Sequence, residues 1–200
     1  MSNKAFRRMD VSARRHQLLE VGCELFASQP YDEVWIDHVA ARAGVSRGLL
    51  YHYFGSKRDF LRAIVEHEAA ALLAATEPDP DLPPPEQLRA ALDGYLDYVA
   101  NHPHGYRAIY RGTASTDAQV RTIIDNNLRQ QEQRLLTALT YGESPSERLR
   151  LAIHGWIAFV VATCLDWLDN PTLDATAIRD LCADALTGIL TTGNHLFRAR

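Results

Sequence analysis

The segment covering residues 36–57 constrains the fold of this 200-residue chain more than any other part. Its sequence, IDHVAARAGVSRGLLYHYFGSK, holds two short stretches of helical periodicity on either side of Gly44. Glycine suits the left-handed residue that follows a helix, and Ser46 suits the N-cap of the next helix. Apolar side chains at helical spacing let both helices pack on a preceding one; they are Val39, Ala40, Ala43, Val45, Leu50 and Phe54. The segment therefore predicts a helix-turn-helix arrangement.

The rest of the chain also has helical periodicity, and strand-like alternation with turn dipeptides is absent. Five of the nine prolines fall within residues 78–85, where a helix would lose backbone hydrogen bonds. We therefore expect an all-α protein of about nine helices. Its parts are a three-helix N-terminal domain at residues 11–71, a proline-rich connection at 72–85 and a C-terminal helical domain at 86–200. Beyond the prolines, helices are expected over residues 86–101, 103–112, 117–140, 146–168 and 174–195.

The second short helix, residues 47–54, has the dimensions and side chains of a DNA-reading element. Eight residues at about 1.5 Å each span about 12 Å, which matches the width of the major groove. Arg47 carries a planar fork that can pair with guanine, and Leu49 can contact a thymine methyl group. Gly48 lets the backbone approach the bases closely. These features predict that the helix reads base pairs in the major groove.

Neighbouring residues can hold the phosphate backbone. Hydroxyl, imidazole and ammonium donors suit phosphate oxygens, as do free N–H groups at a helix start; the expected contacts are Ser46, Tyr51, His52, Tyr53 and Lys57. Lys57 begins the next helix, where a cation opposes the helix dipole and so indicates an external anion. The alternative is an ordinary helical hairpin with aromatic core residues. Tyr51 and Tyr53 weigh against it, because they point about 200° apart on a helix.

The run AGVSRGLLYHYFGSKRDFL closely resembles the DNA-binding domain of the TetR family of transcriptional regulators. The resemblance implies an all-helical homodimer with a three-helix reading head, a fourth helix as a lever, and a C-terminal body that binds a small ligand and dimerises. It implies that Arg47, Gly48 and Leu49 lie near the bases, and that Asp37 can accept a hydrogen bond from cytosine. Trp35 departs from the family, which usually has Thr or Ser there. Its indole N–H can donate to a phosphate but cannot cap the helix.

Basic residues are concentrated at the N-terminus. The formal net charge is −4, yet the first fifteen residues include Lys4, Arg7, Arg8, Arg14 and Arg15. A basic arm on an acidic body fits a polyanion bound at one end. The expected partner is double-stranded DNA with a pseudo-palindromic operator, because two heads of a dimer about 34–36 Å apart match two half-sites.

The last two long helices are the candidates for homodimerisation. Their apolar side chains exceed the needs of one small core; they are Leu151, Trp156, Val160, Cys164, Trp167, Leu181, Leu186, Ile189 and Leu190. Paired across a two-fold axis, they would form a four-helix bundle. The apolar stretch at 151–168 has about the length of a membrane span but contains His154, Thr163 and Asp166. We therefore expect a buried or interface helix and no membrane partner.

Aromatic residues of the C-terminal domain are candidates for a pocket that binds an unknown small-molecule effector. We single out His102, Tyr106, Tyr110, Trp156 and Phe159, because polar groups beside aromatic walls can orient a ligand. Plain core packing is the alternative for each of them. The Glu-His-Glu run at residues 66–68 is expected on a solvated face.

Signatures of catalysis, of a cofactor and of a metal site are not found in the sequence. The three cysteines, Cys23, Cys164 and Cys182, lie far apart among apolar neighbours, which is typical of core thiols in a reducing cytoplasm. We therefore expect a cytoplasmic repressor, and no enzyme, that a small molecule releases from its operator. The alternatives are an activator of the same family, and a helical ligand-binding or interaction protein with an idle DNA head.

Overall fold

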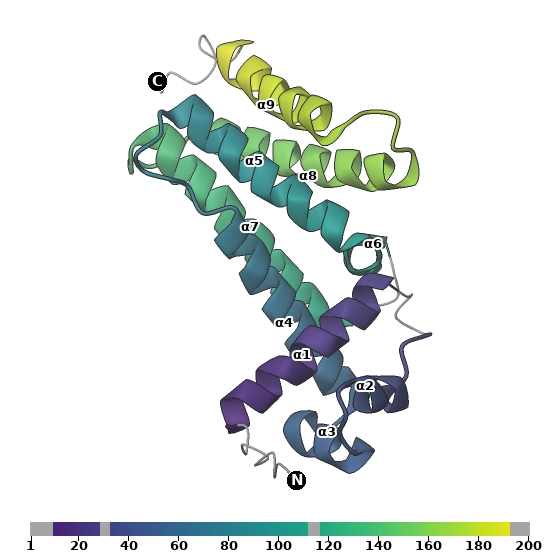
Figure 1. Cartoon of the computed structure of the whole chain (residues 1–200). Helices are drawn as coiled ribbons and strands as arrows, with labels where there is room; N and C mark the ends of the chain where they lie inside the picture. Colours follow the sequence, from purple (N-terminus) through teal and green to yellow (C-terminus); the bar gives the residue numbers. More distant parts are fainter. Residues whose placement is uncertain (1–9, 29–32, 112–116, 193–200) are drawn as a thin grey trace.

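The computed structural model describes residues 10–28, 33–111 and 117–192, which form nine α-helices and no strand (Figure 1). The helices are α1 (Val11–Ser28), α2 (Ile36–Arg42), α3 (Arg47–Phe54), α4 (Lys57–Ala75), α5 (Pro84–Asn101), α6 (Pro103–Arg111), α7 (Ala118–Thr140), α8 (Glu147–Asp169) and α9 (Ala175–Thr192). The prediction of an all-α protein with about nine helices is confirmed. The basic residues Lys4, Arg7 and Arg8 lie outside the described residues, so their proposed role stays a prediction.

The proline-rich segment separates α4 from α5 and also contains the first residues of α5. α4 continues to Ala75, and α5 already starts at Pro84 with Pro83 as its N-cap. The expectation that this helix starts at residue 86 was therefore wrong. Proline is tolerated in the first turn because an N–H there has no partner within the helix. The stretch without helix covers residues 76–83.

The first three helices and the start of α4 form a small head domain around a core of their own. α2 packs on α1 and α3, and α4 packs on α1 and α3. Leu18, Val39, Leu50 and Phe60 are almost completely buried at its centre. Burial of each such side chain contributes about 1.5–3 kcal/mol. This core fixes α3 relative to α2, which is what a rigid reading head needs.

α4 connects the head domain to the body. It runs out of the head and lies along α7 (Figure 1). Side chains of α7 hold its C-terminal half: Asn127 Nδ2 donates to the carbonyl of Ala69 at 2.8 Å, and Arg134 donates to that of Leu73 at 2.7 Å. α1 packs on α6 and gives a second connection. A displacement of α7 or α6 would therefore act on the head.

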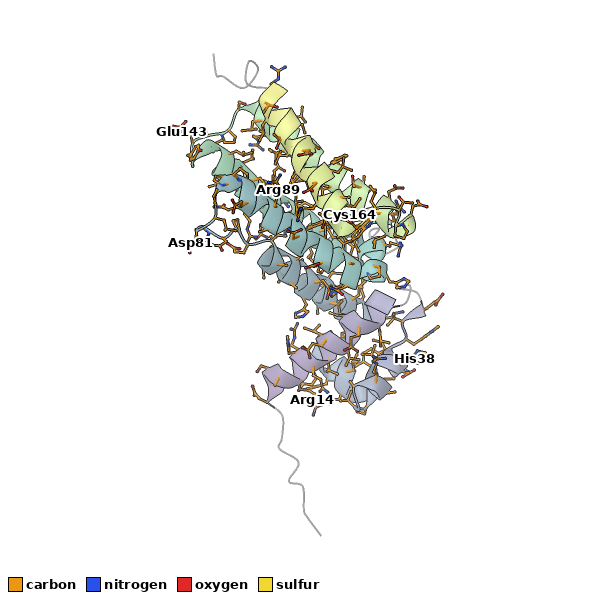
Figure 2. All side chains as sticks on the ribbon, turned by 45° about the horizontal axis from the view of Figure 1, so that its top comes forward. Arg14, His38, Asp81, Arg89, Glu143 and Cys164 are labelled. Atoms are coloured by element: carbon orange, nitrogen blue, oxygen red, sulfur yellow. The ribbon has the colours of Figure 1, made fainter. Side chains whose placement is uncertain are left out.

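The body is built from α5 to α9 around a second core. Cys164, labelled in Figure 2 among the helices of the body, is completely buried, as are Cys182 and Tyr106. Trp156 donates its indole N–H to the carbonyl of Cys182 at 2.9 Å. The cysteines are free buried thiols, as the sequence predicts. Burial raises the pKa of Cys164 to about 12, so this thiol stays protonated and unreactive.

The outer face of α8 is apolar and exposed. By length and composition α8 is, within the described part of the chain, the one helix that could cross a membrane, and only 28% of its apolar stretch is buried. Several residues expected at a dimer interface instead pack inside the protomer, and for them the prediction was wrong; they are Trp156, Val160, Cys164 and Leu186. At 3.6 residues per turn, these four positions fall on the sides of α8 and α9 that face the core of the protomer itself. Leu151 and Phe159 on α8, with Leu181 on α9, remain exposed.

Candidate nucleic-acid interface and ligand cavity

Local capping fixes the turn between α2 and α3. Gly44 follows α2 with φ +66°, a left-handed conformation that glycine adopts without strain. Ser46 is the N-cap of α3, and its Oγ accepts a hydrogen bond from Leu49 N at 3.1 Å. Both caps and the eight-residue length of α3 agree with the sequence prediction. The N–H groups of Arg47 and Gly48 lie in the first turn, where a helix leaves such donors without an internal partner.

Arg47 is held in one orientation on the exposed side of α3. Its Nη1 lies 3.4 Å from Asp37 Oδ2 on α2, and its guanidinium lies over the Tyr51 ring, 5.5 Å from the centroid. Arg47 and Asp37 are both more than half exposed, so their ion pair contributes little to stability. The pair presents a donor fork and a carboxylate acceptor side by side at the surface, and base-edge recognition uses both groups.

Gly48 has no internal reason to be glycine. Its φ is not positive, and a Cβ added there would meet only Ser46 Oγ, at 3.9 Å. The fold would therefore accept alanine, which also favours a helix. The missing side chain matters only to a molecule that approaches α3 from outside.

Gly48→Ala should separate folding from DNA binding. We expect the free energy of unfolding to stay the same or rise by up to about 1 kcal/mol, because alanine is the better helix former. Operator affinity should fall by about tenfold or more, because a methyl group forced into a close contact costs about 1–3 kcal/mol. Chemical denaturation and a DNA titration measure the two effects. Wild-type affinity in the variant would show that this backbone does not approach the bases.

The rest of α3 is less exposed than the sequence predicts. Leu49, Tyr51 and Tyr53 are half-buried, and both tyrosines pack against the edge of the head core. The expectation that the two tyrosines could not both contact the core was wrong. The rings of Tyr51 and Tyr53 lie on opposite sides of this short helix, and each is large enough to pack against the edge of the core. His52 is exposed, and its ring lies 5.8 Å from that of Tyr53.

Trp35 and Lys57 lie together beside α3. Trp35 is the N-cap residue of α2 and, as predicted, makes no side-chain capping hydrogen bond. Its side chain is 61% exposed, and Lys57 Nζ lies 5.7 Å from the ring centroid. The aromatic face attracts the ammonium group and orients it. Two of the expected phosphate contacts are thus neighbours at the surface.

The five candidate ligand residues do not form one site. Tyr110 and Trp156 line a cavity of about 300 Å³ in the body. Tyr106 is fully buried and lines a separate void of about 20 Å³, Phe159 is exposed on α8, and His102 contacts Glu68. No three His, Cys, Asp or Glu side chains among the described residues are grouped so that they could hold a metal ion.

The cavity lies between α5, α7, α8 and α9; Tyr110 of α6 and the end of α4 complete its wall. Its walls are mostly apolar, which is typical of small-molecule sites. Its polar groups on α7 were missed by the sequence analysis; they are Asn127, Gln131 and Arg134. Asn127 and Gln131 are one turn apart on a face that also carries Leu128, Leu135 and Leu139. Polar residues in an apolar helical stripe were a signal that could have found them.

A buried carboxylate joins the head to the body. Glu68 of α4 is only 8% exposed, so the expectation of a solvated face was wrong for this residue. Its Oε2 lies 2.7 Å from His102 Nδ1 and accepts a hydrogen bond from the Tyr98 hydroxyl at 2.9 Å. Burial alone would raise the pKa of Glu68, but hydrogen bonds from His102, Cys23 and Tyr98 outweigh it and lower the pKa. The hydrogen bond to Glu68 raises the pKa of His102 against its partial burial.

Comparison with known proteins identifies both parts of the chain. Residues 18–64 match the family model described as bacterial regulatory proteins, tetR family. Residues 84–188, more than half of the chain, match that of the tetracyclin repressor-like C-terminal domain. The chain belongs to the TetR family. The resemblance seen in the helix-turn-helix segment is confirmed, and this TetR-family protein is a DNA-binding transcriptional regulator.

Individual relatives agree with the family. The HTH-type transcriptional activator FasR of Mycolicibacterium smegmatis is 26% identical and aligns over 84% of this chain and 78% of its own. A TetR-family regulator from Streptomyces coelicolor is 27% identical and superposes with a TM-score of 0.87 over 94% of this chain and 84% of that one. The regulator FadR of Bacillus subtilis, solved in complex with stearoyl-CoA, shares the fold at 19% identity, with a TM-score of 0.70 over 86% of this chain and 96% of its own.

Proposed function

We propose that this TetR-family regulator is a dimeric cytoplasmic repressor that leaves its operator when a small molecule fills the cavity in its body. The observation that carries the proposal is the surface of α3. There Asp37 and Tyr51 orient Arg47. The neighbouring residue is Gly48, where the fold has room for a larger side chain. This surface suits the major groove, with Ser46, His52, Tyr53, Lys57 and Trp35 around it as phosphate contacts.

Arg47 and Asp37 suit a G·C base pair. Guanine offers O6 and N7 to an arginine fork, and cytosine offers its N4 donor to a carboxylate. The two side chains already lie 3.4 Å apart, so a base pair can meet both without a large rearrangement. Leu49 follows on the same helix and can contact a thymine methyl group.

Arg47→Ala should weaken operator binding by about 1–3 kcal/mol and relax the preference at one base pair. Stability should change little, because the Arg47–Asp37 pair is exposed. Arg42→Ala is the matched control, since Arg42 is an exposed arginine of α2 that pairs with Glu24 at 2.9 Å. Titrations of the operator and of random duplex test both variants. Equal weakening on the two DNAs would assign Arg47 to phosphate.

The exposed apolar face of α8 and α9 supports dimerisation. On α8 it carries small and apolar side chains at helical spacing; they are Leu151, Gly155, Ala158, Phe159 and Ala162. A Cβ at Gly155, or at Gly188 on α9, would meet nothing within 4 Å. A second copy of this face would cover it across a two-fold axis and give the four-helix bundle expected from the sequence.

Release by a ligand is supported by the position of the cavity. Its wall includes Asn127 and Arg134, the α7 residues that hold the carbonyls of α4. α4 carries the head, so filling the cavity can change the spacing of two heads in a dimer. A shift from mostly bound to mostly released needs about 3–5 kcal/mol of differential ligand affinity. The complex of FadR with stearoyl-CoA indicates that this fold can hold a molecule with a long acyl chain.

Operator selection from random duplex DNA at two salt concentrations tests the proposal. We expect an enriched two-fold-symmetric site, with binding that falls steeply as salt rises because phosphate contacts release counterions. Folded, dimeric protein without an enriched sequence would refute it and would favour the alternative of an idle DNA head.

Activation of transcription is the second candidate function, because the relative FasR is named an activator. The same head would bind the same operator in either case. A promoter reporter distinguishes the two. Deletion of the gene for this regulator should raise reporter expression if the protein is a repressor and lower it if the protein is an activator.

A further inference from the structure

The cavity in the body is long and narrow. Its lining residues run from Pro84 to Tyr95 along α5 and from Asn127 to Leu139 along α7. At about 1.5 Å per residue, these stretches are about 17 and 18 Å long. A volume of about 300 Å³ over such a length leaves a mean width of about 4 Å, which is close to the contact distance of two carbon atoms. The cavity therefore has the width of a single hydrocarbon chain.

One end of the cavity is open and the other is closed. The connection between α4 and α5 and the turn between α7 and α8 lie at the same end of the body (Figure 1). The lining residues at this end, Pro84, Arg89 and Ala138, are exposed. At the other end, Tyr95 and Asn127 are no more than 9% exposed. A ligand therefore enters beside the first turns of α5, and its inner end becomes buried.

The closed end offers a ligand mainly apolar surface, because its polar groups have partners within the protein. Trp156 and Asn127 donate to backbone carbonyls at 2.9 and 2.8 Å. The Tyr95 hydroxyl lies 2.8 Å from that of Tyr106 and also bonds that of Tyr110. A hydroxyl donates one hydrogen bond and accepts others, so the three tyrosines form one chain. An aliphatic tail fills this end without burying an unpaired polar group.

The wall becomes more polar toward the open end. Gln131, between the two ends of the α7 stretch, bonds the Thr76 hydroxyl at 3.2 Å. Arg89 and Asp184, with charges of opposite sign, are exposed on the wall. A polar head group beside them keeps its contact with water and so avoids the cost of desolvation. The cavity thus suits a molecule with an apolar tail inside and a polar head at the open end.

We propose that the effector is an amphipathic molecule with one unbranched aliphatic chain of about ten carbon atoms, whose tail fills the cavity and whose polar head stays at the open end. This inference rests on the proposed function and names the chemical class of its ligand. At the roughly 30 Å³ that a water molecule occupies, a cavity of about 300 Å³ holds about ten non-hydrogen atoms. An extended chain advances about 3.8 Å per three bonds, so about ten carbon atoms span about 11 Å and fit within the length of the cavity.

A series of straight-chain alcohols tests the inference on the full-length protein without DNA. From 1-hexanol through 1-octanol to 1-decanol, ligand-observed NMR titration should give dissociation constants that fall about fourfold per added CH₂ group. The step to 1-dodecanol should gain less than about threefold in all, because the further carbons remain in water at the open end. The branched isomer of 1-decanol, 3,7-dimethyl-1-octanol, should bind about tenfold more weakly, because its methyl branches overfill a narrow cavity.

Two variants should move the chain length at which the gain stops, in opposite directions. Ala91→Leu adds carbon atoms to the α5 wall and should move it to about 1-octanol. Val160→Ala removes carbon atoms from the α8 wall, where Val160 is 5% exposed, and should extend the full gain to 1-dodecanol. Ala90→Leu is the matched control, at the exposed position next to Ala91 and outside the lining, and should keep the wild-type series. A general disturbance of the fold would not shift the length both ways.

The inference is overturned if affinity keeps rising about fourfold per CH₂ group through 1-dodecanol, if the branched isomer binds as tightly as 1-decanol, or if no alcohol binds up to its solubility limit. A gain that stops at 1-decanol in both lining variants would place the chain outside this cavity and would overturn it as well. None of these results bears on the operator selection, which uses no ligand. A failure of operator binding, in turn, would leave the measured alcohol series standing. The two proposals can therefore fail separately.

Discussion

Phe159→Asp is expected to convert the proposed dimer into monomers. Phe159 is 38% exposed on the outer face of α8, beside the small residues of a face that we propose a second copy covers. The two-fold axis places both aspartates in one apolar interface, where burial of unpaired carboxylates costs several kcal/mol. We expect the dimer dissociation constant to rise by about 1,000-fold or more, equivalent to about 4 kcal/mol. Analytical ultracentrifugation measures it.

The same variant should lose most of its operator affinity, because a monomer reads only one half-site. Tyr141→Asp is the matched control: Tyr141 is 90% exposed between α7 and α8, and aspartate tolerates its positive φ of 52°. This control should remain dimeric. A dimeric Phe159→Asp variant with an unchanged dissociation constant would place the subunit interface elsewhere.

Glu68→Gln is expected to lower the free energy of unfolding by about 2 kcal/mol near pH 5.5, because it removes the buried carboxylate that binds Tyr98 and the partly exposed His102. The lowered pKa of Glu68 means that its stabilisation is present above the ordinary value of 4.5 and is lost as pH falls through the folded value. The raised pKa of His102 means that its stabilisation is present below 6.5 and is lost as pH rises through the folded value.

The difference in stability between wild type and Glu68→Gln should therefore be greatest between about pH 4.5 and 6.5. Urea denaturation across this range measures it. Glu66→Gln, an exposed position of the same helix, serves as the control and should change stability by less than about 0.5 kcal/mol. A difference that does not vary with pH would show that the Glu68–His102 pair does not titrate as a unit.

Local sequence signals predicted the elements of the reading head well. Gly44 and Ser46 marked the turn, because a left-handed C-terminal residue and an N-cap depend on the nearest neighbours in the chain. The effect of Trp35 on capping was also predicted, since an indole has no oxygen to accept from the first turn. The prolines misled only about the start of α5, where the first turn accepts them.

The candidate ligand site could be predicted only in part. Tyr110 and Trp156 were chosen as aromatic residues, and they do line the cavity, but so were Tyr106 and Phe159, which do not. Hydrophobic periodicity shows that a helix has an apolar side, but it does not show which other helix packs against that side. Residues of the same type therefore divide among core, cavity and outer surface.

By itself, the sequence determined the helical elements, the caps of the turn and the side chains of α3, because these follow from interactions within about four residues. Only the tertiary structure decided that Glu68 meets His102, that Gln131 lies at the wall of a cavity, and that Phe159 faces outward. The physical reason is that these positions depend on how distant helices pack against one another. Packing angle and rotation are set by the whole core and not by any one segment.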